Sequence, residues 1–461
     1  MKKTIFKPAF LIAAFLIAMT SCSSSDEKEE EEEIVVDTPV LTVAPITLNF
    51  GEVVNGQLSV AKTFTVTASH LTQAVTLTVT EGFVISADNA GFSASIEIPA
   101  ASFVNGTAKT FYAKFSPTTV GAKTGTITVT SPEVPQKQIN LSGTGTPVIH
   151  NYQTFNSQRL AFNGGFQQAS VQYFNLHNDL TNIEKINMYI NLRCPTGGCN
   201  AWDVYANVQV RDVASGEWYE IGRYITPYGK NNAQVDRGFE IDVTDFKSLL
   251  QGNVEMRAYI EVWGSDGWLL SVDFDYIEGT PDYQYYAISR LIQYNANSLE
   301  GVIYGEDASA FDLTKSAQIP ANAQATSLRT IITGWGHATP NDVGGRPCAE
   351  WCFRTHDVKI NGANTFSHYM GPIGCASNPV QPQGGNWNQD RAGWCPGMAV
   401  PVRVDNFTNA MAGQSFNFEY TFQPWTNDLQ GQADNIHAYY AISSFVVVKS
   451  NTPIAKPIVT E

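Results

Sequence analysis

Val75-Thr-Leu-Thr-Val-Thr80 is the stretch that decides the fold of the N-terminal part, because apolar and polar residues alternate along it. This alternation predicts a strand with one buried face. The pattern recurs at 64–67, 111–115 and 125–130, and the turn-forming pairs Asn55-Gly56, Asn105-Gly106 and Ser116-Pro117 separate the strands. Residues 38–147 are therefore predicted to form an immunoglobulin-like β-sandwich.

Strand patterns continue beyond a predicted linker, Gly143-Thr-Gly-Thr-Pro147. They occur at 185–192, 204–210, 254–260, 327–332 and 439–448, and Thr280-Pro281 is predicted to separate two blocks of strands. We expect an all-β chain in which two eight-stranded antiparallel jelly rolls, 150–285 and 286–461, follow the first sandwich. One helical turn is expected near 243–250, with Thr244 or Asp245 as its cap.

The N-terminus carries a targeting pattern. Three lysines precede an apolar run at 9–19, and Thr20-Ser21 then precedes Cys22. This order predicts a lipoprotein signal peptide at 1–21 with Cys22 lipidated, whereas a plain secretory signal would leave that cysteine incidental. Residues 22–37 are predicted to be an acidic flexible tether. The tether resembles the surface-export segment of Bacteroidetes lipoproteins, so we expect an outer-membrane protein that faces the cell surface.

Composition limits the class of protein. Aromatic residues make up 11% and charged residues 15% of the chain, which suits an exported β protein. The formal net charge is −15, with 43 acidic and 28 basic residues and no basic stripe. Nucleic-acid binding is therefore not expected, the membrane is contacted only through the lipid, and we expect a monomer.

Six cysteines remain when Cys22 is set aside, and an even number in an exported chain predicts three disulfides. Short spacings favour Cys194–Cys199 and Cys348–Cys352, which leaves Cys375–Cys395. A zinc site at Cys348, Cys352 and His356 is the rival interpretation, which an oxidising compartment disfavours. In the Cys348-Ala-Glu-Trp-Cys352 loop, a carboxylate stands beside an indole, a combination suited to gripping a sugar.

Several rare strings follow one another between about residue 150 and the C-terminus. They are CPTGGCNAWD at 194–203, GEWYEIGRYITP at 216–227, EIDVTDFKSLL at 240–250, SVDFD at 271–275, GWGH at 334–337, CAEWCFRTH at 348–356, DRAGWCPGMAVPV at 390–402 and AISSFVVVK at 441–449. In these strings the chain resembles the bacterial peptide-N-glycosidase F family of secreted amidases.

The resemblance implies two packed jelly rolls with a cleft between them, and hydrolysis of the amide that joins N-acetylglucosamine to asparagine in glycoproteins and glycopeptides. It implies no metal and no cofactor. It assigns the essential acid to Asp203, a second acid to Glu350, and a third, acting through a bound water, to Glu261. The expected substrate-binding residues are Arg391, Trp202, Trp263, Trp335, Trp351 and Trp394, and read alone the tryptophans could instead be core residues.

Two positions depart from the family pattern. The best-known member has a charged pair where Asn200-Ala201 stands, and an arginine where Val204 stands. These differences leave open how the innermost sugars and a core fucose are held.

Taken by themselves, the residues favour a carboxylate pair over a serine triad, because the Gly-x-Ser-x-Gly elbow is missing from the sequence. One acid would activate water while the other supplies a proton or holds the substrate. A glycan-binding protein without catalysis and a two-carboxylate glycosidase remain as alternatives.

Overall fold

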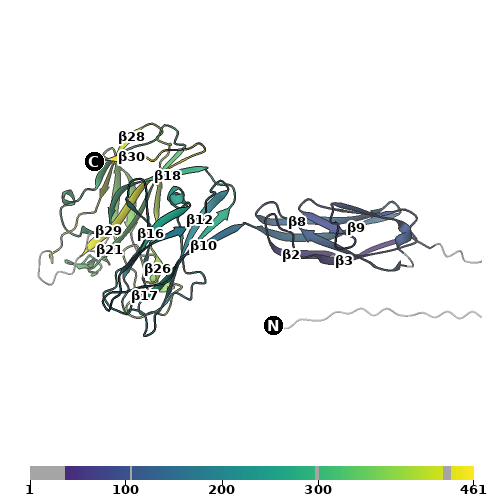
Figure 1. The fold of residues 1–461 in the computed structure, drawn as a ribbon, viewed down its shortest axis with the longest axis horizontal. Helices are drawn as coiled ribbons and strands as arrows, with labels where there is room; N and C mark the ends of the chain where they lie inside the picture. The colour runs from purple at the N-terminus through teal and green to yellow at the C-terminus, as the bar shows by residue number, and fades with distance from the viewer. Residues whose placement is uncertain (1–36, 104–105, 296–300, 429–437) are drawn as a thin grey trace, which may run out of the picture. The chain divides into compact units, whose positions relative to one another are not determined.

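The structure, a computed structural model, describes residues 37–103, 106–295, 301–428 and 438–461. The predicted signal peptide, Cys22, the tether up to residue 36, and Asn105 of one predicted turn lie outside the described residues. In these ranges no helix is both long and apolar enough to cross a membrane. The prediction of an all-β chain is confirmed (Figure 1).

The N-terminal sandwich consists of two sheets, ordered β1-β3-β7-β5 and β2-β9-β8-β4-β6. Its interior contains the alternate apolar residues that the sequence pattern marks, such as Phe64 and Phe111, whose rings stack at 5.5 Å. Its strands are β1 (Val40–Ala44), β2 (Thr47–Val54), β3 (Lys62–Ser69), β4 (Val75–Val79), β5 (Phe83–Ser86), β6 (Ser95–Ile98), β7 (Lys109–Phe115), β8 (Gly121–Ser131) and β9 (Val134–Thr146), with a short 3-10 helix, η1 (Ala100–Ser102).

The predicted linker is wrong over most of its length, because residues 143–146 are the last residues of strand β9. The glycines there meet close neighbours rather than forming a flexible joint. A Cβ on Gly143 would lie 2.6 Å from the Phe115 ring, and one on Gly145 would lie 2.2 Å from the Thr119 carbonyl oxygen. Only glycine allows neighbouring atoms to come so close to the backbone, so these glycines indicate a tightly packed strand.

The first jelly roll has sheets ordered β10-β17-β12-β15 and β11-β16-β13-β14-β26. Its strands are β10 (Ile149–Leu160), β11 (Ala169–Asn175), β12 (Ile183–Arg193), β13 (Tyr205–Arg211), β14 (Trp218–Ile225), β15 (Phe239–Asp242), β16 (Asn253–Ile260) and β17 (Trp268–Glu278). The last strand of the second sheet, β26 (Met398–Ala399), comes from much later in the chain.

The second jelly roll has sheets ordered β18-β29-β21-β27 and β25-β24-β28-β20-β30. Its strands are β18 (Tyr285–Tyr294), β19 (Val302–Ile303), β20 (Thr314–Gln318), β21 (Ala325–Trp335), β22 (His337–Ala338), β23 (Cys348–Ala349), β24 (Arg354–Ile360), β25 (Ala363–Met370), β27 (Arg403–Asn406), β28 (Ser415–Thr421), β29 (Tyr439–Ser450) and β30 (Ile458–Thr460), with 3-10 helices η5 (Ala308–Ala310) and η6 (Cys375–Ser377).

The predicted helical turn exists as the 3-10 helix η3 (Thr244–Leu249), but its predicted cap is wrong. Thr244 is the first helical residue, and Asp242 Oδ1 accepts its backbone N–H at 2.9 Å. Asp245 instead forms ion pairs with Arg329 at 3.1 Å and Lys449 at 3.2 Å. Asp245, three residues after the end of β15, therefore contacts the second jelly roll rather than capping the helix.

A buried ion pair joins the two jelly rolls. Glu220 and Arg223, both on β14, have no exposed side-chain surface, and their contact is 2.8 Å. Arg223 also donates to the Ala441 carbonyl oxygen at 2.6 Å and to Thr333 Oγ1 at 2.8 Å, while Ser443 donates to Glu220 Oε2 at 2.6 Å. Because β29 and β21 supply these partners, the polar network fixes how the second jelly roll meets the first.

We expect Arg223→Met to lower the free energy of unfolding of the amidase-like region by about 3–5 kcal/mol, because it leaves the Glu220 carboxylate buried without its cation. Urea unfolding followed by tryptophan fluorescence measures the change. The double variant Glu220→Gln/Arg223→Met should lose less than the single variant. A loss equal to the sum of both single changes would show that the two charges are not coupled.

Candidate active site

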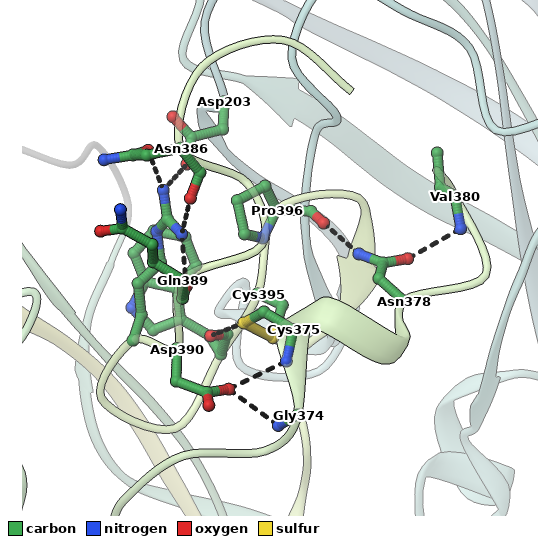
Figure 2. Close-up of a disulfide and its surroundings, with 12 residues drawn as sticks. Asp203, Gly374, Cys375, Asn378, Val380, Asn386, Gln389, Asp390, Cys395 and Pro396 are labelled. Carbon is green, nitrogen blue, oxygen red and sulfur yellow. Dashed lines mark hydrogen bonds and ion pairs between the residues drawn. A yellow bond between two sulfur atoms is a disulfide. The ribbon is translucent and has the colours of Figure 1, made fainter. Parts of the chain in front are cut away.

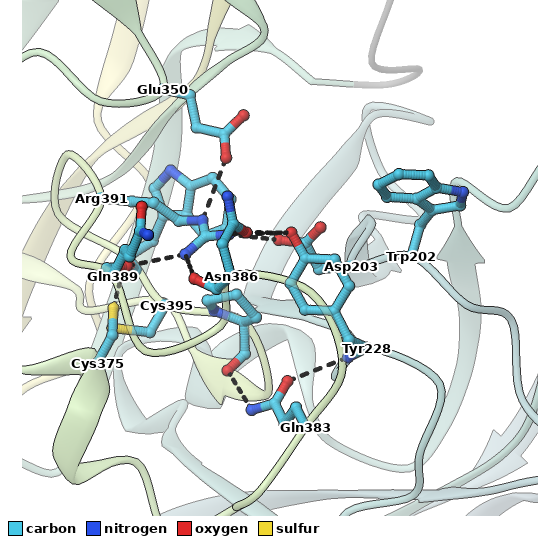
Figure 3. Close-up of polar contacts among 12 residues, drawn as sticks. Trp202, Asp203, Tyr228, Glu350, Cys375, Gln383, Asn386, Gln389, Arg391 and Cys395 are labelled. Atoms are coloured by element: carbon cyan, nitrogen blue, oxygen red, sulfur yellow. Dashed lines mark hydrogen bonds and ion pairs between the residues drawn. A yellow bond between two sulfur atoms is a disulfide. The ribbon is translucent and has the colours of Figure 1, made fainter. Parts of the chain in front are cut away.

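Arg391 is the centre of the candidate site, and Figure 3 shows it between two acids from different jelly rolls. Its Nε donates to Glu350 Oε1 at 3.1 Å, and its Nη2 lies 3.5 Å from Asp203 Oδ2. Nη2 also donates to the Tyr228 hydroxyl at 3.0 Å and to Asn386 Oδ1 at 2.8 Å. The guanidinium therefore fixes the two predicted acids relative to each other.

The loop that carries Arg391 is fastened at several points. The Cys375–Cys395 disulfide closes it, and Asp390 Oδ1 accepts the backbone N–H groups of Gly374 at 2.8 Å and Cys375 at 2.9 Å (Figure 2). After the loop, β26 pairs with β14 of the first jelly roll, with Met398 opposite Ile225. The arginine is thus held by the same sheet that leads to Asp203.

Three of the predicted substrate-binding residues are buried around the guanidinium. Arg391 and Trp394 both have 0% exposed side-chain surface, so their contact with a substrate stays a prediction. Trp394 donates its indole N–H to the Gly334 carbonyl oxygen at 3.0 Å, and its ring lies 5.1 Å from the Arg391 guanidinium carbon. Trp351, also buried, covers the guanidinium at 4.4 Å. These side chains hold Arg391 in place.

Asp203 precedes β13 and reaches Arg391 from the first jelly roll. Burial raises the pKa of its carboxyl above the usual value of 3.8, although the Arg391 guanidinium and the Tyr228 hydroxyl oppose the shift. Its Oδ2 atom is buried, and its contact with Arg391 Nη2 at 3.5 Å is an ion pair without hydrogen-bond geometry. A buried carboxylate oxygen that lacks a well-aligned donor is costly, so this atom is suited to accept a proton or a hydrogen bond from a ligand.

Glu350 reaches Arg391 from the second jelly roll, inside the Cys348–Cys352 loop. The loop is fixed by two backbone hydrogen bonds, from Glu350 N to the Gly336 oxygen at 3.1 Å and from Ala392 N to the Glu350 oxygen at 2.9 Å. Burial and the nearby Asp203 charge raise the pKa of Glu350 to about 8, against the attraction of Arg391. Glu350 therefore holds a proton at neutral pH, and a protonated carboxyl close to a second carboxyl suits acid–base chemistry.

Glu261 directly follows β16, and its backbone N–H donates to the Tyr205 oxygen at 2.9 Å. Burial alone raises the pKa of its carboxyl to about 8. It forms no ion pair within the described ranges, so Glu261 is neutral at pH 7 and can donate a hydrogen bond.

The exposed members of the predicted tryptophan set are Trp202, 68% exposed, and Trp263, 56% exposed and packed against Phe162. Figure 3 shows Trp202 beyond Asp203, on the side away from Arg391. Trp335 is partly buried and packs against Tyr205 and Trp394, with ring centroids at 6.1 Å and 4.5 Å. Of the five predicted tryptophans, Trp202 and Trp263 thus offer the widest open faces for a sugar ring.

The positions that depart from the family pattern have structural roles here. Asn200 donates to Asp266 Oδ1 at 2.8 Å and accepts the Trp202 N–H at 3.1 Å, which shapes the turn before Asp203. Val204 packs against the core of the first jelly roll.

All three predicted disulfides are confirmed, namely Cys194–Cys199, Cys348–Cys352 and Cys375–Cys395. The rival zinc site is therefore wrong, because both thiolates that it requires are bonded to each other. His356 is buried elsewhere, and its Nδ1 accepts the Gln423 N–H at 3.1 Å.

Sequence reasoning missed three residues of this cluster. Tyr228 directly follows the string at 216–227, and His337 ends the string at 334–337. Their position next to or within a family-like string could therefore have pointed to both residues. Asn386 had no such signal; it lies in a glycine-rich loop and accepts from Tyr228 at 2.8 Å.

Comparison with known proteins gives a consistent set of similarities. The family Peptide-N-glycosidase F, C terminal, matches residues 304–447. The chain is 50% identical over 330 residues to Peptide-N(4)-(N-acetyl-β-D-glucosaminyl)asparagine amidase F of Elizabethkingia miricola, covering 71% of this chain and 92% of that protein. A solved structure of PNGase F, a glycosylasparaginase from Flavobacterium meningosepticum, is 51% identical with a TM-score of 0.65, covering 68% of this chain and all of that one. PNGF-II, 13% identical with a TM-score of 0.50 over 85% of this chain and 82% of its own, shares the fold.

The raised pKa of Glu261 predicts a pH-dependent stability. Because its folded-state pKa of about 8 lies above the usual 4.5, the stabilising contribution is full below pH 4.5 and is lost as pH rises through 8. Glu261→Gln should therefore match the wild-type melting temperature at pH 4 and exceed it at pH 9. The control, Glu255→Gln on the same strand, removes an ion pair with Arg211 at 2.9 Å and should give no such gain. Equal melting temperatures for Glu261→Gln and wild type at pH 9 would contradict the raised pKa.

Proposed function

Because the chain belongs to the peptide-N-glycosidase F family, we propose that Asp203 and Glu350 divide the acid–base work of its reaction. The protein is a peptide-N4-(N-acetyl-β-glucosaminyl)asparagine amidase, which releases N-glycans from glycoproteins and glycopeptides. The observation that carries the assignment is the contact of one buried guanidinium with both acids, at 3.5 Å and 3.1 Å.

The proposed reaction is water attack on the asparagine side-chain carbonyl. In its ionised form, Asp203 takes a proton from water as the water oxygen bonds to the carbonyl carbon. Glu350 gives its proton to the departing nitrogen as the carbon–nitrogen bond breaks. The products are an aspartyl peptide and a glycosylamine, which then reacts with a second water to lose ammonia.

The remaining residues hold the groups in place. Arg391 has no exposed surface, so it acts as a positioning residue: it orients Glu350 Oε1 and offsets part of the cost of burying the Asp203 charge. Glu261, neutral at pH 7, is suited to donate a hydrogen bond to a water or a sugar oxygen. Trp202 and Trp263 offer open faces on which the innermost sugars can stack.

We expect a denatured N-glycoprotein treated with the protein to show aspartate at each former glycosylation site by peptide mass spectrometry, with one ¹⁸O gained when the reaction runs in H₂¹⁸O. Asp203→Asn should lower kcat by about 10²- to 10⁴-fold, because the general base is lost. Circular dichroism checks that the variant folds. Wild-type kcat in Asp203→Asn would sink the role of Asp203, and asparagine still bearing one sugar would identify a glycosidase. Glycan binding without release would leave a lectin.

We also propose that the protein is an exported lipoprotein that acts as a monomer at the outer cell surface. The lysines, the apolar run and the cysteine within residues 1–22 support this proposal, as does the acidic tract that follows. The N-terminal sandwich would then hold the amidase away from the membrane, as a spacer.

Cys22→Ser should abolish labelling by a radioactive fatty acid and move the protein from the membrane fraction to the soluble exported fraction. Surface exposure is measured by protease digestion of intact cells, and Cys375→Ser controls for the loss of a cysteine alone. Fatty-acid labelling that persists in Cys22→Ser would contradict lipidation at this position.

A further inference from the structure

His337, Trp351 and Glu350 form a cluster that the mechanism above does not use fully. His337 lies on β22 and pairs with Ala349 on β23, directly beside the residue that carries the acid. Its Nε2 atom lies 3.1 Å from the Trp351 indole nitrogen and 3.9 Å from Glu350 Oε2. One imidazole nitrogen therefore faces both an indole and a catalytic carboxyl.

The hydrogen-bonding chemistry fixes the state of this imidazole. An indole N–H donates and never accepts, so Nε2 must be the unprotonated nitrogen and its lone pair is occupied by Trp351. The proton of neutral His337 is then on Nδ1. Burial and the positive charge of Arg391 lower the pKa of His337, which keeps the ring neutral.

The same reasoning locates the proton of Glu350. Oε1 accepts from Arg391 Nε, and a guanidinium has no lone pair to accept in return. The proton is therefore on Oε2, the oxygen that faces His337. Asp203, Arg391, Tyr228 and His337 are the charged or titratable groups around this carboxyl. Once the imidazole moves in from 3.9 Å to hydrogen-bond distance, a free Nε2 lone pair would take that proton in a hydrogen bond or as an imidazolium.

We propose that the Trp351 indole N–H occupies the lone pair of His337 and so keeps the Glu350 proton free for the departing nitrogen of the substrate. The proposal rests on the proposed function of Glu350 as the general acid. Trp351 and His337 are positioning residues, because Trp351 is buried and acts on Glu350 through the imidazole.

The test is a double-variant cycle on kcat and its pH profile. Trp351→Phe keeps a ring over Arg391 but frees His337 Nε2, so kcat should fall about 3- to 10-fold, the value of one hydrogen bond. The alkaline limb of the pH profile of kcat should move to higher pH, because Glu350 and His337 then share the proton. The double variant Trp351→Phe/His337→Phe should recover most of kcat and return the limb to its wild-type position.

Trp394→Phe is the matched control, since it removes an indole N–H over the same guanidinium but one that donates to Gly334. Adding His337→Phe to it should recover nothing. If His337→Phe also fails to restore Trp351→Phe, the indole only packs against Arg391 and the proposal is overturned.

A measurement on the wild-type protein tests the proposal even if these variants do not fold. ¹⁵N NMR of the wild-type protein at pH 7 should show His337 protonated at Nδ1, and protonation at Nε2 would overturn the proposal. Glu350→Gln distinguishes failure of the general-acid role of Glu350 from failure of the role of the Trp351 indole. If that variant keeps wild-type kcat, the proposed general acid is wrong; if it loses kcat while the tryptophan cycle shows no coupling, only the role of the indole fails.

Discussion

The buried pair of Glu220 and Arg223 is the constraint on which the amidase region depends. Two charges without solvent are tolerated only when their remaining donors and acceptors are satisfied, and here Ala441, Thr333 and Ser443 of the second jelly roll satisfy them. The Tyr205 hydroxyl donates to the same Glu220 at 3.1 Å. Since Tyr205 lies two residues after Asp203, the network that joins the jelly rolls also helps to set the position of Asp203.

The candidate active site also buries charged groups, but here the single cation does not compensate for the burial of both acids. One guanidinium serves two carboxyls that are both desolvated, and it does not fully offset the cost of burial for either. Glu350, inside the disulfide loop, therefore keeps a proton to about pH 8. A surface ion pair would leave both acids ionised at neutral pH, because water would screen the charges. Burial of the two carboxyls, beside a guanidinium that Trp351 and Trp394 cover, is thus what raises both pKa values.

Strand alternation predicted the β architecture well because a half-buried strand needs a period of two, which is a local property. The same local reasoning failed at residues 143–146, where glycines that resemble a linker are strand residues pressed against Phe115 and Thr119. It also did not show that Trp394 and Arg391, which were expected to bind substrate, are fully buried. Tryptophan and arginine occur both in sugar sites and in buried supports, and burial is a property of the packed molecule.

The sequence by itself determined the strand periodicity, the disulfide pairing and the family. Strand period and cysteine spacing are local properties of the chain, and the roles predicted for Asp203, Glu350 and Glu261 rest on the family resemblance. Only the tertiary structure decided that Arg391 joins the two acids, that Tyr228 and Asn386 hold Arg391, and that His337 faces Glu350. The physical reason is that pKa values depend on desolvation and on charges brought together from distant segments. Residues 203, 350 and 391 meet only when two jelly rolls close over a shared buried network.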